Sequence, residues 1–332
     1  MRFTPVLILL IILPATMTLQ LVWAGQNNGL LIVTTFDNLK YDVKQLLAPG
    51  DRVVSLVPPG VDPHSYSLRP QDIELLKKAD LIVSTGHVAF EKQIEKMIKE
   101  GVIKAEMIEI PDIPGIKLLN NPVTGEPNLH MPIYDPYNYI IFISKLAHIM
   151  AVLRPVMKNV YIEKETQVVD KVIEITSSTK RMTGVGVGEA PPTQYAVEWI
   201  GLKIEYLVLI QPGVPAPPSF LKKINELAEQ HKIGYVVVIG NSTSPAHKLL
   251  LNLAEKYGLK TIVVPSPTSP SSILDKLEYI VQEINSSITT NTPINPISIH
   301  YEQLPTSPAP ILLGICVGFV TAYYVLREDE KK

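Results

Sequence analysis

Short apolar runs alternate with helix-like segments through the first half of the chain. Four runs rich in Val, Ile and Leu are typical of buried strands, at residues 30–36, 51–57, 80–86 and 105–110. The segments between them, such as "RPQDIELLKKA" at 69–79, are typical of helices. Strands that alternate with helices indicate parallel β-α-β units. The first half therefore predicts an α/β lobe built on a parallel sheet.

The same alternation returns in the second half, after a long helical stretch. Residues 159–180 contain neither Gly nor Pro and predict one long helix. Strand-like runs then follow at 182–188, 202–210, 233–240 and 259–265. We therefore predict an α/β fold of two parallel-sheet lobes joined by a long rigid helix. The first lobe is expected at 28–155, the linking helix at 156–181 and the second lobe at 182–287. Because open parallel sheets bind ligands at the carboxyl ends of their strands, the binding site is expected in the cleft between the lobes.

The two ends of the chain have their own apolar segments. Residues 1–25 combine a positive charge at Arg2, an apolar run and small residues near Ala24, as in a secretory signal peptide. An uncleaved N-terminal anchor is the alternative. Residues 309–326 carry no charge and are about long enough for a transmembrane helix. A buried C-terminal helix is the alternative there.

The segment between the second lobe and this apolar stretch has the composition of a stalk. Residues 288–308 are rich in Ser, Thr, Pro and Asn, and residues 327–332 form a charged tail. These features predict a protein at the cell surface, exported and anchored in the cell membrane by a C-terminal helix, with the tail in the cytoplasm. Cys316, the single cysteine, lies in the apolar stretch, so no intrachain disulfide can form.

Composition and motifs exclude several function classes. The formal net charge of the 332 residues is −2 without a long run of one sign, so no nucleic-acid partner is expected. No phosphate-binding Gly-Lys-Ser/Thr loop, no Gly-x-Ser-x-Gly elbow and no His-Glu-x-x-His motif occurs. The glycines of "GVGVGEA" at 184–190 alternate within a predicted strand and are followed by two prolines, unlike a dinucleotide loop. The sequence therefore does not predict an enzyme.

Three segments together resemble a known family. "GVDPHSYSLRPQDIELLKKADLIVSTG" at 60–86 resembles the first-lobe motif of the metal-binding receptors of zinc and manganese ABC importers, the cluster A-I or TroA-like solute-binding proteins. "NLHMPIYDPYNYIIFISKLA" at 128–147 is similar to the segment that carries their second histidine ligand. "TSPAHKLLLNLAEKYGLKTIVV" at 243–264 resembles their last strand-helix unit. The likeness covers roughly residues 30–287 and implies their two-lobed fold.

The resemblance also implies ligand positions in the first lobe. It makes His64, in the Pro-His pair, a metal ligand. The second ligand of the family lies four residues before the Asp of Asp-Pro, which is Asp135 here. That position holds Met131, and His130 is one residue earlier. A one-residue bulge would restore His130 to the site.

Departures from the family pattern are larger in the second lobe. The third ligand of the family lies five residues before the helix tyrosine, here Tyr195, and that position holds Ala190 with Glu189 beside it. The fourth ligand position holds Gly240. His247, at the start of the next predicted helix, is a candidate to substitute for the missing ligand.

Four residues are therefore the candidate metal ligands, namely His64, His130, Glu189 and His87. Imidazole and carboxylate are suitable ligands for Zn²⁺ and Mn²⁺. His87 is included because it follows a predicted strand at its carboxyl end. Each has a plain alternative, which is a loop histidine for His64, a surface histidine for His130, a helix-start histidine for His87 and a solvated carboxylate for Glu189. Asp62 either orients the ring of His64 or only forms the turn before it.

These inferences predict an extracytoplasmic solute-binding protein that captures a divalent metal ion for an ABC permease and its ATPase. Zn²⁺ is favoured over Mn²⁺, because imidazoles outnumber carboxylates among the candidates. Two other functions stay open. One is a surface adhesion or interaction module that kept the fold without the metal, which the residues at Ala190 and Gly240 favour. The other is a receptor for another solute, such as a chelate or a small organic ligand.

Overall fold

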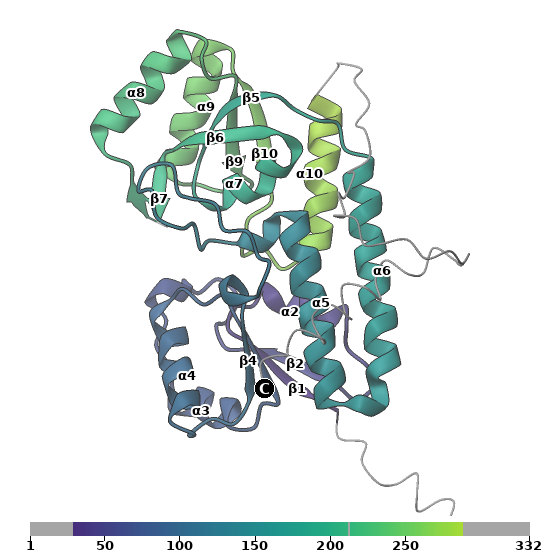
Figure 1. Cartoon of the computed structure of the whole chain (residues 1–332). Coiled ribbons are helices and arrows are strands. Elements are labelled where there is room, and N and C mark those ends of the chain that lie inside the picture. Colours follow the sequence, from purple (N-terminus) through teal and green to yellow (C-terminus); the bar gives the residue numbers. More distant parts are fainter. Residues whose placement is uncertain (1–28, 212, 288–332) are drawn as a thin grey trace, which may run out of the picture.

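The computed structural model describes residues 29–211 and 213–287. The predicted signal peptide, stalk, transmembrane helix and cytoplasmic tail lie outside the described residues. The described part contains two sheets stacked one above the other, with long helices running along one side of both (Figure 1). The prediction of an α/β fold with parallel sheets is confirmed.

The first lobe is built on a four-stranded parallel sheet with the strand order β2-β1-β3-β4. Its strands are β1 (Leu31–Thr34), β2 (Arg52–Ser55), β3 (Leu81–Ser84) and β4 (Glu106–Glu109). Its helices are α2 (Leu39–Lys44), α3 (Pro70–Leu76) and α4 (Ala89–Lys99). All four residues of β3 are buried, which explains why the central strands are continuous apolar runs in the sequence.

The second lobe has a four-stranded parallel sheet with the order β10-β9-β5-β6. Its strands are β5 (Gly184–Gly188), β6 (Leu202–Leu207), β9 (Tyr235–Ile239) and β10 (Lys260–Val264). The run 202–210 was predicted as one strand, but it divides into β6 and β7 (Leu209–Gln211), which pairs with β8 (Val214–Pro215) in an antiparallel hairpin. Its helices are α7 (Pro192–Val197), α8 (Pro218–Glu229), α9 (Pro245–Tyr257) and α10 (Ile273–Ser287).

The alternating glycines of β5 are explained by close packing. A Cβ atom at Gly188 would lie 2.1 Å from the Thr193 Oγ1 atom in α7, and one at Gly186 would lie 3.0 Å from Ile204 Cδ1. Only glycine lets the helix and the neighbouring strand approach this closely. These glycines are therefore packing residues, in agreement with the rejection of a dinucleotide loop.

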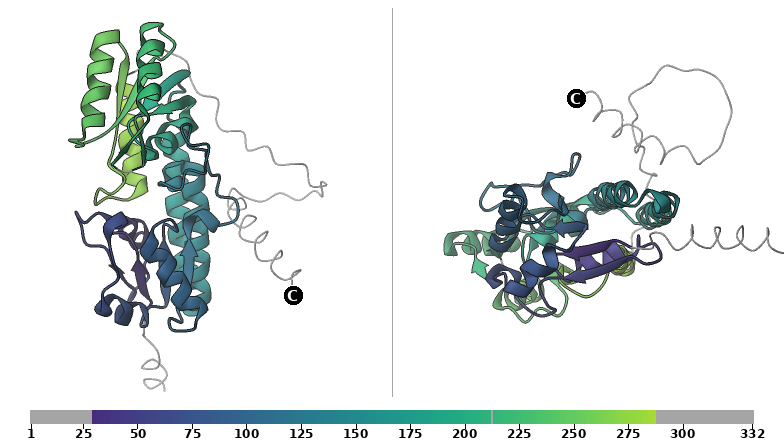
Figure 2. Two further views of the ribbon diagram at one scale, coloured as in Figure 1. Left: turned by 90° about the vertical axis from the view of Figure 1, so that its left-hand side faces the viewer. Right: turned by 90° about the horizontal axis from the view of Figure 1, so that it is seen from below.

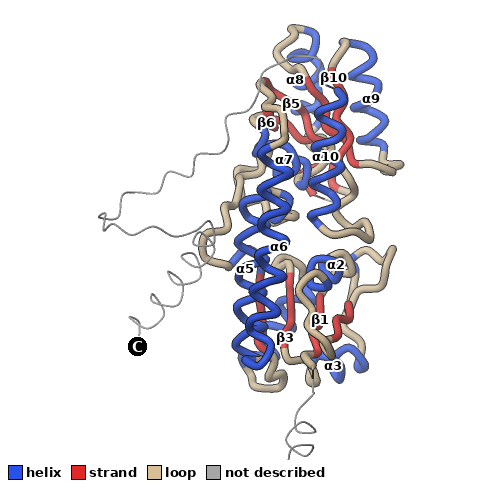
Figure 3. Tube along the Cα trace, turned by 90° about the vertical axis from the view of Figure 1, so that its right-hand side faces the viewer, coloured by secondary structure: helices blue, strands red, loops and turns tan. Residues whose placement is uncertain are grey.

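Two antiparallel helices run alongside both sheets (Figures 1 and 3). They are α5 (Pro136–Leu153) and α6 (Lys158–Ser177), the second of which coincides with the predicted linking helix. The buried Asp51 carboxylate ties the turn between them to the first lobe, since it pairs with Arg154 at 2.8 Å and accepts a hydrogen bond from the Tyr161 hydroxyl at 2.7 Å. Although α5 is long and apolar enough to cross a membrane, more than half of it is buried inside the protein, as in a core helix.

The lobes meet at the carboxyl ends of their strands (Figure 2). Tyr134, in the short helix Pro132–Tyr134, donates a hydrogen bond of 2.8 Å to the carbonyl oxygen of Pro265, directly after β10. Asn128 donates to the Pro191 carbonyl oxygen at 2.8 Å, three residues after β5. These bonds place the loops of the first lobe against the carboxyl edge of the second sheet.

A buried carboxylate also joins the lobes. Asp42 in α2 accepts hydrogen bonds from the backbone nitrogen of Ile273 at 2.7 Å and from the Tyr139 hydroxyl at 3.0 Å, through Oδ1. Its Oδ2 atom has no hydrogen-bond partner in the described part of the chain. Burial raises the pKa of Asp42 to about 7, and burial lowers the pKa of the nearby Lys276 ammonium to about 8.

We expect Asp42→Asn to reduce the pH dependence of folding stability. The pKa of Asp42 in the folded protein, about 7, lies above its ordinary value of 3.8. The unfolded chain therefore loses this proton first as the pH rises from about 4 to 7, and the free energy of unfolding falls. Asparagine keeps the acceptor for Ile273 but cannot ionise. The free energy of unfolding should therefore fall less with rising pH in the variant than in the unaltered chain, by at least about 1 kcal/mol. Urea unfolding of the metal-free protein between pH 5 and 8 measures it.

The matched control is Asp170→Asn, at an exposed position on α6. It should unfold with the pH dependence of the unaltered chain. If Asp42→Asn has that same pH dependence, the carboxylate does not retain its proton in the folded state.

Candidate metal centre

Three imidazole rings converge at the carboxyl edge of the first sheet. The site contains His64, His87 and His130. Each offers one ring nitrogen, and these three nitrogens lie within 4.8 Å of one another. The ring centroids are 5.5 Å apart for His64 and His87, 5.0 Å for His87 and His130, and 5.9 Å for His64 and His130. Nitrogens bound to one tetrahedral Zn²⁺ are roughly 3.3 Å apart, so small ring rotations would let the three bind a common ion.

His64 is presented by a short helix that follows β2. The helix Pro63–Ser65 begins after Asp62, whose side chain accepts a hydrogen bond of 3.0 Å from the backbone nitrogen of His64. Asp62 therefore holds the backbone of the turn, and no described contact joins it to the imidazole ring. The His64 side chain is exposed, so this ring is the most accessible of the three.

His87 is placed by the sharp turn between β3 and α4. Gly86 has a φ of 73°, a conformation that residues with side chains rarely adopt. A Cβ atom there would also lie 3.1 Å from the ring carbon Cδ of Pro111. The Nδ1 atom of His87 lies 3.4 Å from the Thr85 carbonyl oxygen. When Nδ1 carries the proton and donates to that oxygen, Nε2 keeps the lone pair that a metal requires.

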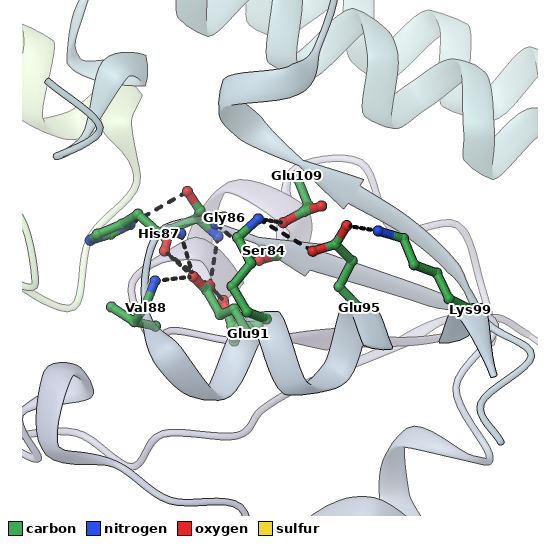
Figure 4. Close-up of polar contacts among 11 residues, drawn as sticks. Ser84, Gly86, His87, Val88, Glu91, Glu95, Lys99 and Glu109 are labelled. Carbon is green, nitrogen blue, oxygen red and sulfur yellow. Dashed lines mark hydrogen bonds and ion pairs between the residues drawn. The ribbon is translucent and has the colours of Figure 1, made fainter. Parts of the chain in front are cut away.

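The buried carboxylate of Glu91 organises the turn that carries His87. It accepts hydrogen bonds from the backbone nitrogens of Thr85 at 2.8 Å, His87 at 2.9 Å and Val88 at 3.2 Å. The hydroxyl of Thr35 donates to it as well, at 2.6 Å. Figure 4 shows the carboxylate beneath the turn, with the His87 ring pointing away from it. The sequence alone did not reveal this role of Glu91, although a Glu in the first turn of α4 is the signal of a capping residue.

His130 reaches the cluster because the next residue adopts a left-handed conformation. Met131 has φ 62° and ψ 51°, which is the left-handed helical conformation. Glycine adopts it readily, asparagine and aspartate adopt it less often, and other residues rarely do. This local kink supplies the one-residue displacement that the sequence required. The backbone nitrogen of His130 donates a hydrogen bond of 3.0 Å to Asn128, which itself bonds to Pro191 and Gln194 of the second lobe. The loop of His130 is therefore fixed from both lobes.

The environment of the cluster keeps its imidazoles in the form that binds metals. Burial lowers the pKa of His130 to about 4, with smaller contributions from His87 and His64. Burial also lowers the pKa of His87, and the Glu91 carboxylate partly opposes this effect. Both rings are neutral at pH 7, so their lone pairs are available to a cation.

Glu189, the fourth candidate, is not part of this cluster. It lies directly after β5 in the second lobe and is 2% exposed. Its Oε1 atom accepts hydrogen bonds from Ser242 at 2.5 Å and Ser244 at 2.8 Å. Its Oε2 atom accepts from the backbone nitrogen of Ile239 at 2.9 Å and lies 3.0 Å from Nδ1 of His247. The structure thus brings together three of the four candidates and engages the fourth in contacts within its own lobe.

The comparisons with known proteins agree with a metal-binding receptor. Residues 32–286 match the family described as zinc-uptake complex component A, periplasmic. A putative metal-binding protein of Thermotoga maritima is 28% identical over 74% of this chain and 87% of its own length. A high-affinity zinc uptake system protein of Haemophilus ducreyi is 45% identical over a shorter segment, 19% of this chain and 20% of its own length.

Solved structures share the fold. The solute-binding protein FpvC of Pseudomonas aeruginosa, in complex with Mn²⁺, has a TM-score of 0.62 and 20% identity, covering 78% of this chain and 99% of its own. A Mn²⁺-bound point mutant of a periplasmic metal-binding protein of Candidatus Liberibacter asiaticus has a TM-score of 0.60 and 18% identity, covering 78% of this chain and 99% of its own.

These comparisons confirm the resemblance found in the sequence. They support a periplasmic or extracytoplasmic location and a metal-binding rather than an enzymatic role. Because the family match covers most of the chain, the protein belongs to the zinc-uptake complex component A family of metal-binding solute-binding proteins.

Proposed function

We propose that this chain is the extracytoplasmic receptor that captures a divalent metal ion in the interlobe cleft and delivers it to an ABC permease. The observation that carries this proposal is the convergence of His64, His87 and His130 at one sheet edge. These residues belong to three loops that lie far apart in the sequence. Convergence of three imidazoles at the carboxyl edge of a parallel sheet is the arrangement expected of a metal site rather than of a packed core.

Zn²⁺ is the cargo that this set of ligands favours over Mn²⁺. Imidazole nitrogen is a good ligand for Zn²⁺, whereas Mn²⁺ prefers carboxylate, carbonyl and water oxygens. The cluster has three imidazoles, and the buried Glu91 carboxylate beside His87 is engaged by the backbone of its own turn. Three protein ligands leave one coordination position open, which suits a carrier that has to release its cargo.

Adhesion without metal and binding of another solute are less well supported by the site. Ala190 and Gly240 favoured the adhesion module, because their side chains offer no ligand atom where the family pattern places ligands. The three imidazoles of the cluster all come from the first lobe, so the cluster does not depend on positions 190 and 240. Burial lowers the pKa of His130 to about 4, so at neutral pH the lone pair of this ring is available to a cation.

Delivery needs a partner at the membrane. Membership in a zinc-uptake family supports a permease and its ATPase as that partner. Anchoring by residues 309–326 would keep the loaded receptor close to the permease, and it is part of this proposal.

Replacing any one of the three histidines should sharply weaken Zn²⁺ binding. Each of His64→Ala, His87→Ala and His130→Ala removes one nitrogen of the set, so the dissociation constant should rise at least about 100-fold, because loss of an outer-shell partner alone costs roughly 10- to 100-fold. Calorimetric titration of Zn²⁺ into the purified full chain measures it.

His231→Asn serves as the control, because it removes an exposed imidazole of the second lobe at a left-handed position that asparagine tolerates. Its affinity should equal that of the unaltered chain. If none of the three alanine variants binds Zn²⁺ more weakly than this control, the proposed function is wrong.

Glu91→Gln should weaken both folding and metal binding. An amide offers one acceptor oxygen where the carboxylate accepts several bonds, so donors of the His87 turn would be left without partners. We expect a stability loss of about 2–3 kcal/mol and a clearly reduced Zn²⁺ affinity. Urea unfolding measures the loss of stability. Titration with Zn²⁺ under conditions in which the variant is folded measures the loss of affinity.

Glu95→Gln is the matched control, one helical turn further along α4, where the carboxylate pairs with Lys92 and Lys99 at the surface. It should cost little, because exposed ion pairs stabilise weakly. Equal stability and equal Zn²⁺ affinity of the two variants would show that Glu91 does not position His87.

A further inference from the structure

The second lobe carries its own histidine at the carboxyl edge of its sheet. His247 is the third residue of α9, which follows β9, and its backbone nitrogen donates a hydrogen bond of 3.0 Å to the capping hydroxyl of Ser244. Its Nδ1 atom lies 3.0 Å from the Glu189 carboxylate, which follows the neighbouring strand β5. The backbone and one ring nitrogen of His247 are therefore both held in place.

The contact with Glu189 determines which ring nitrogen is free. An ionised carboxylate only accepts hydrogen bonds, so Nδ1 of His247 carries a proton and donates it. In the neutral ring, Nε2 then keeps the lone pair. Nε2 has no hydrogen-bond partner among residues 29–211 and 213–287, and the side chain is 17% exposed. This is the state in which a histidine binds a metal while a carboxylate fixes its other nitrogen.

Glu189 itself is not available as a ligand. Its two oxygens accept from Ser242, Ser244, Ile239 and His247, and the carboxylate is almost completely buried. Direct ligation would break several charge-assisted hydrogen bonds and leave buried donors without partners, at a cost of about 1–3 kcal/mol for each. Its contacts are those of a residue that orients another.

The carboxyl edge that bears His247 faces the cluster of the first lobe. Pro191, two residues after Glu189, accepts a hydrogen bond from Asn128, and Asn128 accepts one from the backbone nitrogen of His130. On the other side, Tyr134 bonds to Pro265 directly after β10, the strand next to β9. The segments that flank β9 are thus in contact with the loop that carries His130 (Figures 1 and 2).

We propose that His247 supplies the second-lobe ligand of the metal site, through Nε2, and that Glu189 is the positioning residue that holds its ring. This inference rests on the proposed function. His247 would enter the position left open by the three first-lobe histidines when the lobes close around the ion. The completed set is four imidazoles, which selects Zn²⁺ over Mn²⁺ more strongly than three imidazoles and water do.

The number of imidazoles around the bound ion tests the inference. X-ray absorption spectroscopy of the Zn²⁺-loaded full chain should give four imidazoles, and His247→Gln should give three with one oxygen. The dissociation constant for Zn²⁺ should rise about 10- to 100-fold in His247→Gln, with a smaller change for Mn²⁺. His231→Asn should match the unaltered chain in both measurements.

Glu189→Gln separates positioning from ligation. At saturating Zn²⁺ it should keep four imidazoles, while its affinity falls about 10-fold, since an amide oxygen still accepts from Nδ1 without the charge. If the unaltered chain has three imidazoles and one carboxylate oxygen, and Glu189→Gln loses that oxygen while His247→Gln keeps the three imidazoles, Glu189 is the ligand and the inference is wrong. Should Glu189→Gln fail to fold, the count in His247→Gln still decides.

The result can also separate this inference from the proposed function. If the unaltered chain shows three imidazoles, and His247→Gln binds like the control while His64→Ala does not bind, His247 is no ligand but the receptor function stands. If the unaltered chain does not bind Zn²⁺, the proposed function and the inference both fail.

Discussion

The geometry of the site depends on two buried carboxylates that must be satisfied by the loops after the strands. Glu91 is fully buried and Glu189 nearly so. A buried charge is tolerated only when it is fully hydrogen-bonded, so each carboxylate gathers donors from the turns around it. Glu91 collects the backbone nitrogens that flank His87, and Glu189 collects two hydroxyls, one backbone nitrogen and the ring of His247. The requirement to satisfy these charges thereby fixes the turn of His87 and the ring of His247.

In the proposed site the same carboxylates would balance the charge of a bound ion. Burial lowers the pKa of His130 to about 4 and also lowers the pKa of His87, so these two rings carry no charge at neutral pH. A divalent cation that enters among neutral ligands needs negative charge nearby, and carboxylates held behind the histidines provide it without using a coordination position. The proposed arrangement would separate two tasks, because the imidazoles would bind the ion while the carboxylates hold His87 and His247 and compensate the charge.

The cluster is also coupled to the arrangement of the lobes. The loop of His130 is bonded to the second lobe through Asn128, and Met131 adopts a strained conformation beside it. Asp42 joins α2 to the start of α10 on another side of the junction. Movement of the lobes would therefore act on His130 directly. Backbone strain next to a ligand is the kind of local cost that a functional site retains.

The sequence by itself indicated the two parallel sheets and named all three histidines of the cluster as candidates. Alternation of apolar runs with helices is a local property, and each observed main-sheet strand lies inside a predicted run. His64 and His130 were candidates from the resemblance, and His87 was a candidate only because it follows a predicted strand. Only the tertiary structure decided that His87 joins the other two and that Glu189 contacts His247 instead. Those contacts join residues as much as 58 positions apart, and the chain brings them together only when the strands pair and their carboxyl ends meet at one edge.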